Sequence, residues 1–190
     1  AISLTGEPTL YEPISELIGA FHTRGFTTFL VTNGTLPEAL AKLSIEPTQL
    51  YISVCAPNKE THKKLCRPTI PDAWERLNET LELLPSFNCP TVIRITAVRG
   101  LNMEPIKDYV RLIEKANPTY IEPKAFMHVG FSRLRLNYDH MPSHGEIRDF
   151  ALKLAEETGY NMIDESEDSR VVLLSRLEKP ISSQTYKMLC

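Results

Sequence analysis

The spacing of apolar residues changes repeatedly between the two-residue period of a strand and the 3.6-residue period of a helix. Strands are predicted at residues 1–4, 27–32, 50–54, 91–98, 120–126, 160–163 and 171–174. Helices are predicted at residues 14–21, 37–43, 59–65, 73–84, 106–117 and 144–158. This alternation predicts an α/β fold in which crossover helices join parallel strands, followed by a closing pair of strands.

Three helix starts are marked by capping patterns. Ser143 with Glu146, Asp72 with Glu75, and Thr35 ahead of Pro37 each match the residue types that satisfy the first amides of a helix. We therefore expect these helices to begin just after those capping residues, and Gly159 to end the last one.

The predicted parallel strands fit either an open doubly wound sheet or a barrel. In both architectures the chemistry lies at the carboxyl ends of the strands. The segments that follow the predicted strands are also the most polar or the richest in glycine and proline: 5–8, 32–34, 53–57, 98–102 and 124–132. Two independent signals therefore place a functional site at this edge.

Composition narrows the class of protein. The chain has 190 residues, of which 42% are hydrophobic and 24% charged, as in a single globular domain. No run approaches the roughly 18 apolar residues that a membrane-spanning helix needs. The 21 basic and 24 acidic residues give a net charge of −3, so a nucleic acid would have to meet a local basic patch or residues outside the chain.

The cysteines do not form a recognisable metal site. Cys55, Cys66, Cys89 and Cys190 include no C-x-x-C pair, and their low density favours a reducing, cytoplasmic location. The chain begins at Ala1 within a predicted strand, which suggests a longer natural polypeptide. We expect a partial barrel over residues 1–177 and a loose polar tail over 178–190.

Charged residues occur inside two predicted strands. Arg94 interrupts an apolar strand, where an arginine is costly unless it meets an anion. It could clamp a ligand carboxylate, or form a structural salt bridge with Glu122. Glu122 and Lys124 alternate on one face and are the candidate catalytic residues of a polar barrel interior, the alternative being the exposed face of an edge strand.

A polar segment after the predicted strand at 120–126 combines basic and aromatic residues. It includes His128, Ser132, Arg133, Arg135, His140 and His144, near Phe126 and Phe131. Such a mixture suits base stacking and phosphate contacts with RNA, although a solvated loop has the same composition. A smaller patch contains Lys63, Lys64 and Arg67, for which a solvated helix end is the simpler interpretation.

Several short phrases, taken in order, resemble a known family. They are Ser3 to Tyr11, Leu30 to Gly34, Tyr51 to Val54, Arg94 to Thr96, Ile121 to Gly130 and Met141-Pro142-x-His144. Together they resemble the radical S-adenosylmethionine (SAM) enzymes of wyosine biosynthesis, the tRNA 4-demethylwyosine synthases. The resemblance runs from Ala1 to about Leu177.

The resemblance implies a fold and a cofactor site. The fold would be a partial (βα)6 radical SAM-type TIM barrel that lacks its first strand and its cluster loop. The backbone of Gly6, Glu7 and Pro8 would bind the methionyl amino group of SAM. The nucleoside, ribose, carboxylate and adenine would lie near Thr32, Asn33, Ser53, Arg94 and Asn102. Contacts with tRNA would come from His128, Ser132, Arg133 and His144.

The resemblance also implies a reaction of the lyase type. SAM is cleaved reductively to a 5′-deoxyadenosyl radical, which acts on N1-methylguanosine beside the anticodon of phenylalanine tRNA. Pyruvate supplies two carbons to give 4-demethylwyosine, and an electron donor is required. The [4Fe–4S] cluster would be held by a C-x3-C-x2-C motif that this chain lacks, so the chain alone is expected to be inactive. Cys55 stands where relatives often carry aspartate.

Other functions remain open from the sequence. Another radical SAM branch, such as an activase-like enzyme, would share the barrel features. A catalytically silent tRNA-binding module would keep the basic loop without the chemistry. An ordinary (βα) sugar or phosphate enzyme is disfavoured because the chain has no glycine-rich phosphate loop.

Overall fold

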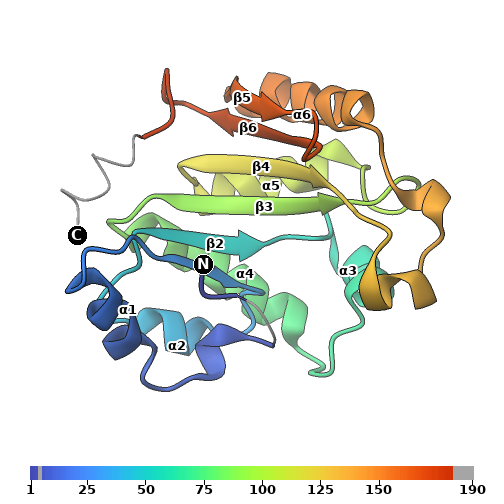
Figure 1. Ribbon diagram of the computed structural model, residues 1–190. Helices are drawn as coiled ribbons and strands as arrows, with labels where there is room; N and C mark the ends of the chain where they lie inside the picture. Colours follow the sequence, from blue (N-terminus) through green and yellow to red (C-terminus); the bar gives the residue numbers. More distant parts are fainter. Residues whose placement is uncertain (4–5, 182–190) are drawn as a thin grey trace.

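The protein is built around one mixed β-sheet (Figure 1). The computed structural model describes residues 1–3 and 6–181. The sheet has the strand order β1-β2-β3-β4-β6-β5. Its strands are β1 (Phe29–Thr32), β2 (Gln49–Ser53), β3 (Thr91–Ala97), β4 (Tyr120–Ala125), β5 (Asn161–Ser166) and β6 (Val171–Ser175). The first four strands run parallel, and β6 runs antiparallel to both β4 and β5.

Crossover helices connect the parallel strands, as predicted. The α-helices are α1 (Ile14–His22), α2 (Pro37–Ala41), α3 (Lys59–Cys66), α4 (Ala73–Leu83), α5 (Ile106–Ala116) and α6 (His144–Thr158). Short 3-10 turns are η1 (Pro8–Leu10), η2 (Leu84–Ser86), η3 (Gly130–Leu134) and η4 (Tyr138–His140). In Figure 1, α4 and α5 lie behind the sheet, whereas α3 and the loop after β4 lie beyond the carboxyl ends of β2, β3 and β4.

The hydrophobic core occupies the helix-covered face of the sheet. Ile52, Ile93 and Ile121 on adjacent strands are fully buried there against Leu77 of α4 and Tyr109 of α5. Burying each large apolar side chain of this kind contributes about 1.5–3 kcal/mol. A separate small cluster of Val98, Phe126 and Met141 lies under the loop after β4. The loop is therefore packed onto the carboxyl edge.

Strand alternation directs a polar row to the other face. In β3, Ile93 and Ile95 enter the core, so Arg94 and Thr96 project from the opposite side. Arg94 is in register with Ser53 on β2 and Glu122 on β4, and Thr96 is in register with Lys124. The prediction that Arg94, Thr96, Glu122 and Lys124 share one face is therefore confirmed, and Ser53 extends this row to a third strand.

The two ends of the chain refine the prediction. Ile2 forms an isolated parallel bridge with Leu30, while Leu4 of the predicted first strand and Thr5 of the segment after it lie outside the described residues. The closing strands form the predicted pair, but the second of them, β6, is the one beside β4. Val172 and Leu174 are fully buried on β6, whereas β5 carries exposed residues and takes the edge. Most of the predicted tail, 182–190, lies outside the described residues.

The capping predictions had mixed outcomes. Ser143 and Glu146 form the predicted reciprocal capping box at the start of α6, and Gly159 ends that helix with a positive φ of 70°. Asp72 occupies the predicted N-cap position of α4, which begins at Ala73, but its side chain makes no capping hydrogen bond, because its carboxylate accepts a hydrogen bond from Arg76 Nε at 2.8 Å. Thr35 does not cap α2 either, since Leu36 occupies the cap position. Among the described residues, no helix combines the length and apolar character needed to cross a bilayer.

Candidate functional site

Glu7 ties together two turns at the carboxyl edge of the sheet. Its Oε1 accepts hydrogen bonds from Thr9 N (3.1 Å), Thr9 Oγ1 (2.7 Å) and Thr32 Oγ1 (2.6 Å). Its Oε2 accepts a hydrogen bond from Asn33 N at 2.8 Å. The carboxylate thus holds the turn at Gly6 against the end of β1. Because the Glu7 side chain is used in this way, the predicted contact with a ligand amino group would come from the backbone of this segment.

The Gly6 turn presents bare backbone to solvent. Gly6 has a φ of +86°, and a β-carbon there would meet nothing within 4 Å. Glycine is needed for this conformation rather than for close packing. Because Glu7 holds the turn in place, the peptide group between Gly6 and Glu7 is held at the surface, open to a ligand. This is the arrangement expected of a site that recognises an amino group through carbonyl oxygens.

The turn after β1 is committed to its own hydrogen bonds. Asn33 Oδ1 accepts from Thr35 N (2.9 Å) and Thr35 Oγ1 (2.6 Å), and the buried Thr32 hydroxyl oxygen accepts from Gly34 N at 3.1 Å. Gly34 has a φ of +71°, and a β-carbon there would lie 2.9 Å from Leu77 Cδ1. The predicted roles of Thr32 and Asn33 near a nucleoside stay predictions, since both side chains shape this turn.

Arg94 forms the salt bridge with Glu122 that the sequence offered as one of two possibilities. Arg94 Nε lies 2.7 Å from Glu122 Oε1, with the side chains 30% and 13% exposed. The guanidinium also stacks 4.5 Å from the centre of the Tyr51 ring. Burial raises the pKa of Tyr51 to about 12, with Glu122 contributing. Among the described residues the Arg94 Nη groups have no hydrogen-bond partner, so they remain available to an anion.

Lys124 and Ser53 complete the polar row. Lys124 lies opposite Thr96 on one side and Val171 on the other, and it pairs with no carboxylate in the described part of the chain. Ser53 is half-buried opposite Arg94. A cavity of about 180 Å³ beside Glu122 is also lined by Asp164 and Glu165 of β5. The catalytic roles of Glu122 and Lys124 stay predictions, on a face where both can reach a ligand.

Asn102 holds strand ends together. Its Nδ2 donates to the carbonyl oxygens of Cys55 and Thr96, both at 2.8 Å, and its Oδ1 accepts from Val98 N at 2.6 Å. The side chain is fully buried and both of its N–H groups are used. The predicted place of Asn102 near an adenine stays a prediction, and its side chain is committed to these backbone groups.

The predicted RNA-contact residues in the loop after β4 are of two kinds. His128 Nε2 lies 3.0 Å from Leu136 O, and Ser132 Oγ donates to Val129 O at 2.6 Å, so both shape the loop. Arg133, in contrast, is exposed and has no polar partner among the described residues. It lines an open cavity of about 520 Å³ with the exposed Phe131 and Leu134.

His144 lies apart from the rest of the predicted RNA-contact residues. Its Nε2 lies 2.9 Å from Glu165 Oε2 on β5, and its side chain is only 16% exposed. Its buried Nδ1 has no hydrogen-bond partner among the described residues. The contact of His144 with RNA stays a prediction, but its present bond joins α6 to the sheet edge.

An ion pair between Arg99 and Glu146 connects the end of the loop after β4 to α6, and we call this ion pair the brace. Arg99 Nε donates to Glu146 Oε1 at 2.6 Å, and Arg99 Nη1 donates to Asp139 O at 2.8 Å. The hydrogen bond from Arg99 lowers the pKa of Glu146 to about 2. Because the same carboxylate caps α6 through Ser143, one side chain anchors the helix and the loop.

We expect this brace to weaken in acid. Glu146 has its pKa lowered from 4.5 in the folded protein, so its stabilising effect is full above that value and is lost as the pH falls toward about 2. Glu146→Gln should therefore speed amide exchange at 136–140 at neutral pH and flatten its acid dependence. Glu156→Gln, on the exposed face of α6, is the matched control. Equal exchange in the two variants would contradict this role.

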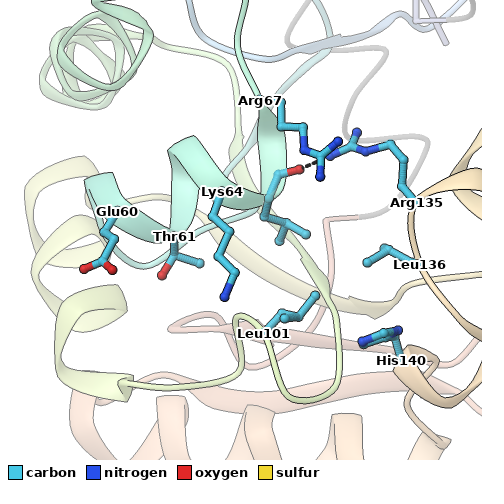
Figure 2. A pocket seen from close by; sticks show the side chains of 9 residues that line it. Glu60, Thr61, Lys64, Arg67, Leu101, Arg135, Leu136 and His140 are labelled. Atoms are coloured by element: carbon cyan, nitrogen blue, oxygen red, sulfur yellow. Dashed lines mark hydrogen bonds between the residues drawn. The ribbon is translucent and has the colours of Figure 1, made fainter.

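A cleft that the sequence did not predict lies between α3 and residues 135–140 (Figure 2). Its volume is about 310 Å³, and its lining includes Glu60, Lys64, Arg67, Leu101, Arg135 and His140. Arg135 Nη2 donates to Leu65 O at the end of α3. The two basic segments were noticed separately in the sequence, but nothing local indicated that the fold brings them together. We call this feature the α3–loop cleft.

The described cysteines do not fit an iron–sulfur cluster. Burial raises the pKa of Cys66 to about 12 and also raises that of Cys55, whereas cluster ligands are thiolates. Within residues 1–3 and 6–181, no three His, Cys, Asp or Glu side chains gather where they could hold a metal. Cluster ligation therefore finds no support in this part of the chain.

Two family models together span most of the chain. Residues 1–113 match the radical SAM superfamily, and residues 115–176 match the wyosine base formation family. An S-adenosyl-L-methionine-dependent tRNA 4-demethylwyosine synthase of Pyrococcus horikoshii is 51% identical over 93% of this chain and 53% of its own length. A synthase of the same name from Methanocaldococcus jannaschii is 45% identical over 96% of this chain and 57% of its own. The chain thus spans about half the length of these relatives.

Solved structures agree with this assignment. A structure described as TYW1 with a lysine-pyruvate adduct bound has a TM-score of 0.84 and 45% identity, covering 92% of this chain and 55% of that one. Coproporphyrinogen III oxidase (HemN) of Escherichia coli, a radical SAM enzyme, has a TM-score of 0.58 at 16% identity over 95% of this chain and 43% of its own, which supports the fold alone. The superfamily implies SAM and a [4Fe–4S] cluster as cofactors. The chain belongs to the radical SAM superfamily, and its relatives are tRNA 4-demethylwyosine synthases.

Proposed function

We propose that this chain is the SAM-binding and RNA-binding part of a radical SAM enzyme that forms 4-demethylwyosine in tRNA. The observation that carries the proposal is the Gly6 turn, which Glu7 fixes at the same edge as the Arg94 row. The relatives' names support the assignment of the reaction. The predicted division into a partial barrel over 1–177 and a tail over 178–190 is part of the proposal.

The described residues fit SAM. The backbone at Gly6 is open to the methionyl amino group, and the free Nη groups of Arg94 suit its carboxylate. Ser53, in register with Arg94, offers a hydroxyl to the ribose. When bound and reduced, SAM supplies a 5′-deoxyadenosyl radical. Glu122 orients Arg94, and we infer that Lys124, which shares this face, exchanges a proton with the substrate through its Nζ.

The remaining partners follow from the proposed reaction. The RNA is phenylalanine tRNA with N1-methylguanosine beside its anticodon, pyruvate supplies two carbons, and an electron donor reduces the cluster. The chain lacks the C-x3-C-x2-C motif that would hold the cluster, so we expect the isolated chain to be inactive. The proposed location is the cytoplasm, where thiols stay reduced.

The proposal is tested with the natural gene product that contains this chain. After reconstitution with iron and sulfide and reduction, it should convert SAM to 5′-deoxyadenosine and, with pyruvate and N1-methylated phenylalanine tRNA, yield 4-demethylwyosine by mass spectrometry. The isolated chain, treated identically, should yield neither product. SAM cleavage without a tRNA product would favour another radical SAM branch. Binding of tRNA without any cleavage would favour a silent binding module.

A further inference from the structure

The α3–loop cleft collects cations that lack acidic partners. Lys64 on α3, Arg67 directly after α3 and Arg135 on the loop are exposed and form no ion pair among the described residues. Several basic side chains elsewhere are paired, for example Lys59 with Glu75 and Lys115 with Glu82, although Lys124 and Arg133 are not paired among the described residues. An anionic ligand would therefore find these charges uncompensated, in a chain whose overall charge is −3.

The geometry of the cleft suits a phosphate. In Figure 2 the guanidinium groups of Arg67 and Arg135 extend toward one another, while Glu60 lies at the opposite end, and Arg135 also donates to Leu65 O. Two facing guanidinium groups repel each other unless an anion lies between them. Both are planar forks that bind phosphate oxygens with two hydrogen bonds.

His140 adds a neutral donor to the same cleft. Its Nδ1 accepts a hydrogen bond from Asn137 N at 2.9 Å. A neutral imidazole with an accepting Nδ1 carries its proton on Nε2, so the ring offers an N–H donor. The apolar side chain of Leu101 forms another part of the lining. A cleft of about 310 Å³ with these donors is larger than a lone phosphate needs, and it favours a phosphodiester that continues beyond it.

The neighbouring surface indicates what that phosphodiester belongs to. Phe131 and Leu134, on the loop segment just before Arg135, are 88% and 82% exposed. An exposed aromatic ring beside a cationic cleft is the combination that binds single-stranded RNA, with stacking on an unpaired base and neutralisation of the backbone. In Figure 1, α3 and the loop after β4, which line the cleft, lie beyond the carboxyl ends of β2, β3 and β4, and Glu7 ties the Gly6 turn to the carboxyl end of β1.

We propose that the α3–loop cleft binds a backbone phosphate of the substrate RNA in an unpaired loop, while Phe131 stacks on a base beside it. This inference rests on the proposed function and assigns a site for its RNA. Arg67, Arg135 and the Nε2–H of His140 hold the phosphate, and Lys64 adds a diffuse positive charge. The cleft then sets the position of the RNA loop relative to the cofactor edge.

Arg67 permits a test that does not compromise folding. Its φ of 49° is in the left-handed region that glycine tolerates best, so Arg67→Gly removes the charge and relieves backbone strain. Combined with Lys64→Gln on exposed α3, it should raise the Kd for tRNA about tenfold in the natural gene product and lower its salt dependence. The matched control is Lys42→Gln, at the exposed residue that directly follows α2. It should leave the Kd unchanged.

The measurement is fluorescence anisotropy of a labelled tRNA transcript over a range of KCl concentrations. Phe131→Ala should weaken binding about fivefold without changing the salt slope, because stacking carries no charge. Equal Kd values for the double variant and Lys42→Gln would overturn the proposal, as would absence of tRNA binding by the wild type. Preferential binding to vesicles rich in phosphatidylserine would overturn the proposal and indicate that the cleft binds a membrane surface instead of RNA. Cleavage of SAM without RNA is assayed separately, so failure of this site and failure of the proposed chemistry are distinguishable.

Discussion

Replacing Glu7 with alanine should lower the free energy of unfolding by about 3 kcal/mol and abolish measurable SAM binding. The side chain accepts four hydrogen bonds that join the Gly6 turn to Thr32 and Asn33. A hydrogen bond to a charged group contributes about 1.5–3 kcal/mol, and bonds that share one carboxylate do not add fully. Chemical denaturation measures the stability loss, and calorimetry with SAM measures the binding loss.

Two further variants separate the network from simple loss of charge. Glu12→Ala removes the same charge from an exposed neighbouring position and should change stability by less than about 0.5 kcal/mol. Glu7→Gln keeps one accepting oxygen and should fall between the wild type and Glu7→Ala. If Glu7→Ala matched Glu12→Ala in stability and in SAM affinity, the fixed Gly6 turn would have no functional role.

Replacing Arg94 with alanine should weaken SAM binding by roughly 12- to 150-fold, which corresponds to about 1.5–3 kcal/mol for a charged hydrogen bond. The variant removes the free Nη groups that would bind the carboxylate of SAM. It also leaves Glu122, which is only 13% exposed, without its ion-pair partner. The second effect also destabilises the fold, because a largely buried carboxylate left unpaired is costly. Calorimetric titration with SAM and a parallel denaturation curve measure the two effects.

The double variant Arg94→Met with Glu122→Gln distinguishes ligand binding from structural support. It removes the ion pair without leaving a charge, so stability should recover toward that of the wild type while SAM affinity stays low. Recovery of both quantities would assign Arg94 to the salt bridge alone. The sequence left these two roles open, and the structure shows the bridge while leaving part of the guanidinium free.

Local patterns predicted the fold well because its elements obey local rules. Alternation in β3 predicted that Arg94 and Thr96 share a face, and the register with β4 places Glu122 and Lys124 beside them. The order of the last two strands was not predictable in the same way. It depends on the burial of the apolar β6 residues against α6 and β4, which is a property of the assembled sheet.

Side-chain hydrogen bonding explains the rest of the differences. The family resemblance implied that Asn102 lies near the adenine, and the loop composition indicated RNA contacts for His128 and Ser132, but the structure commits their side chains to nearby backbone groups. Residue type could not reveal these partners because they depend on how the loops pack. The α3–loop cleft was missed for the same reason, since Arg67 and Arg135 are brought together only by tertiary folding.

Hydrogen exchange of the natural gene product with and without SAM tests the central claim most directly. We expect slower exchange on SAM binding in residues 6–9, 32–34 and 53–55 and around Arg94, which are the segments that the carboxyl edge brings together. Exchange in α1 and at the amino ends of the strands should not change. Protection confined to other segments, or none at these turns at saturating SAM, would contradict the account.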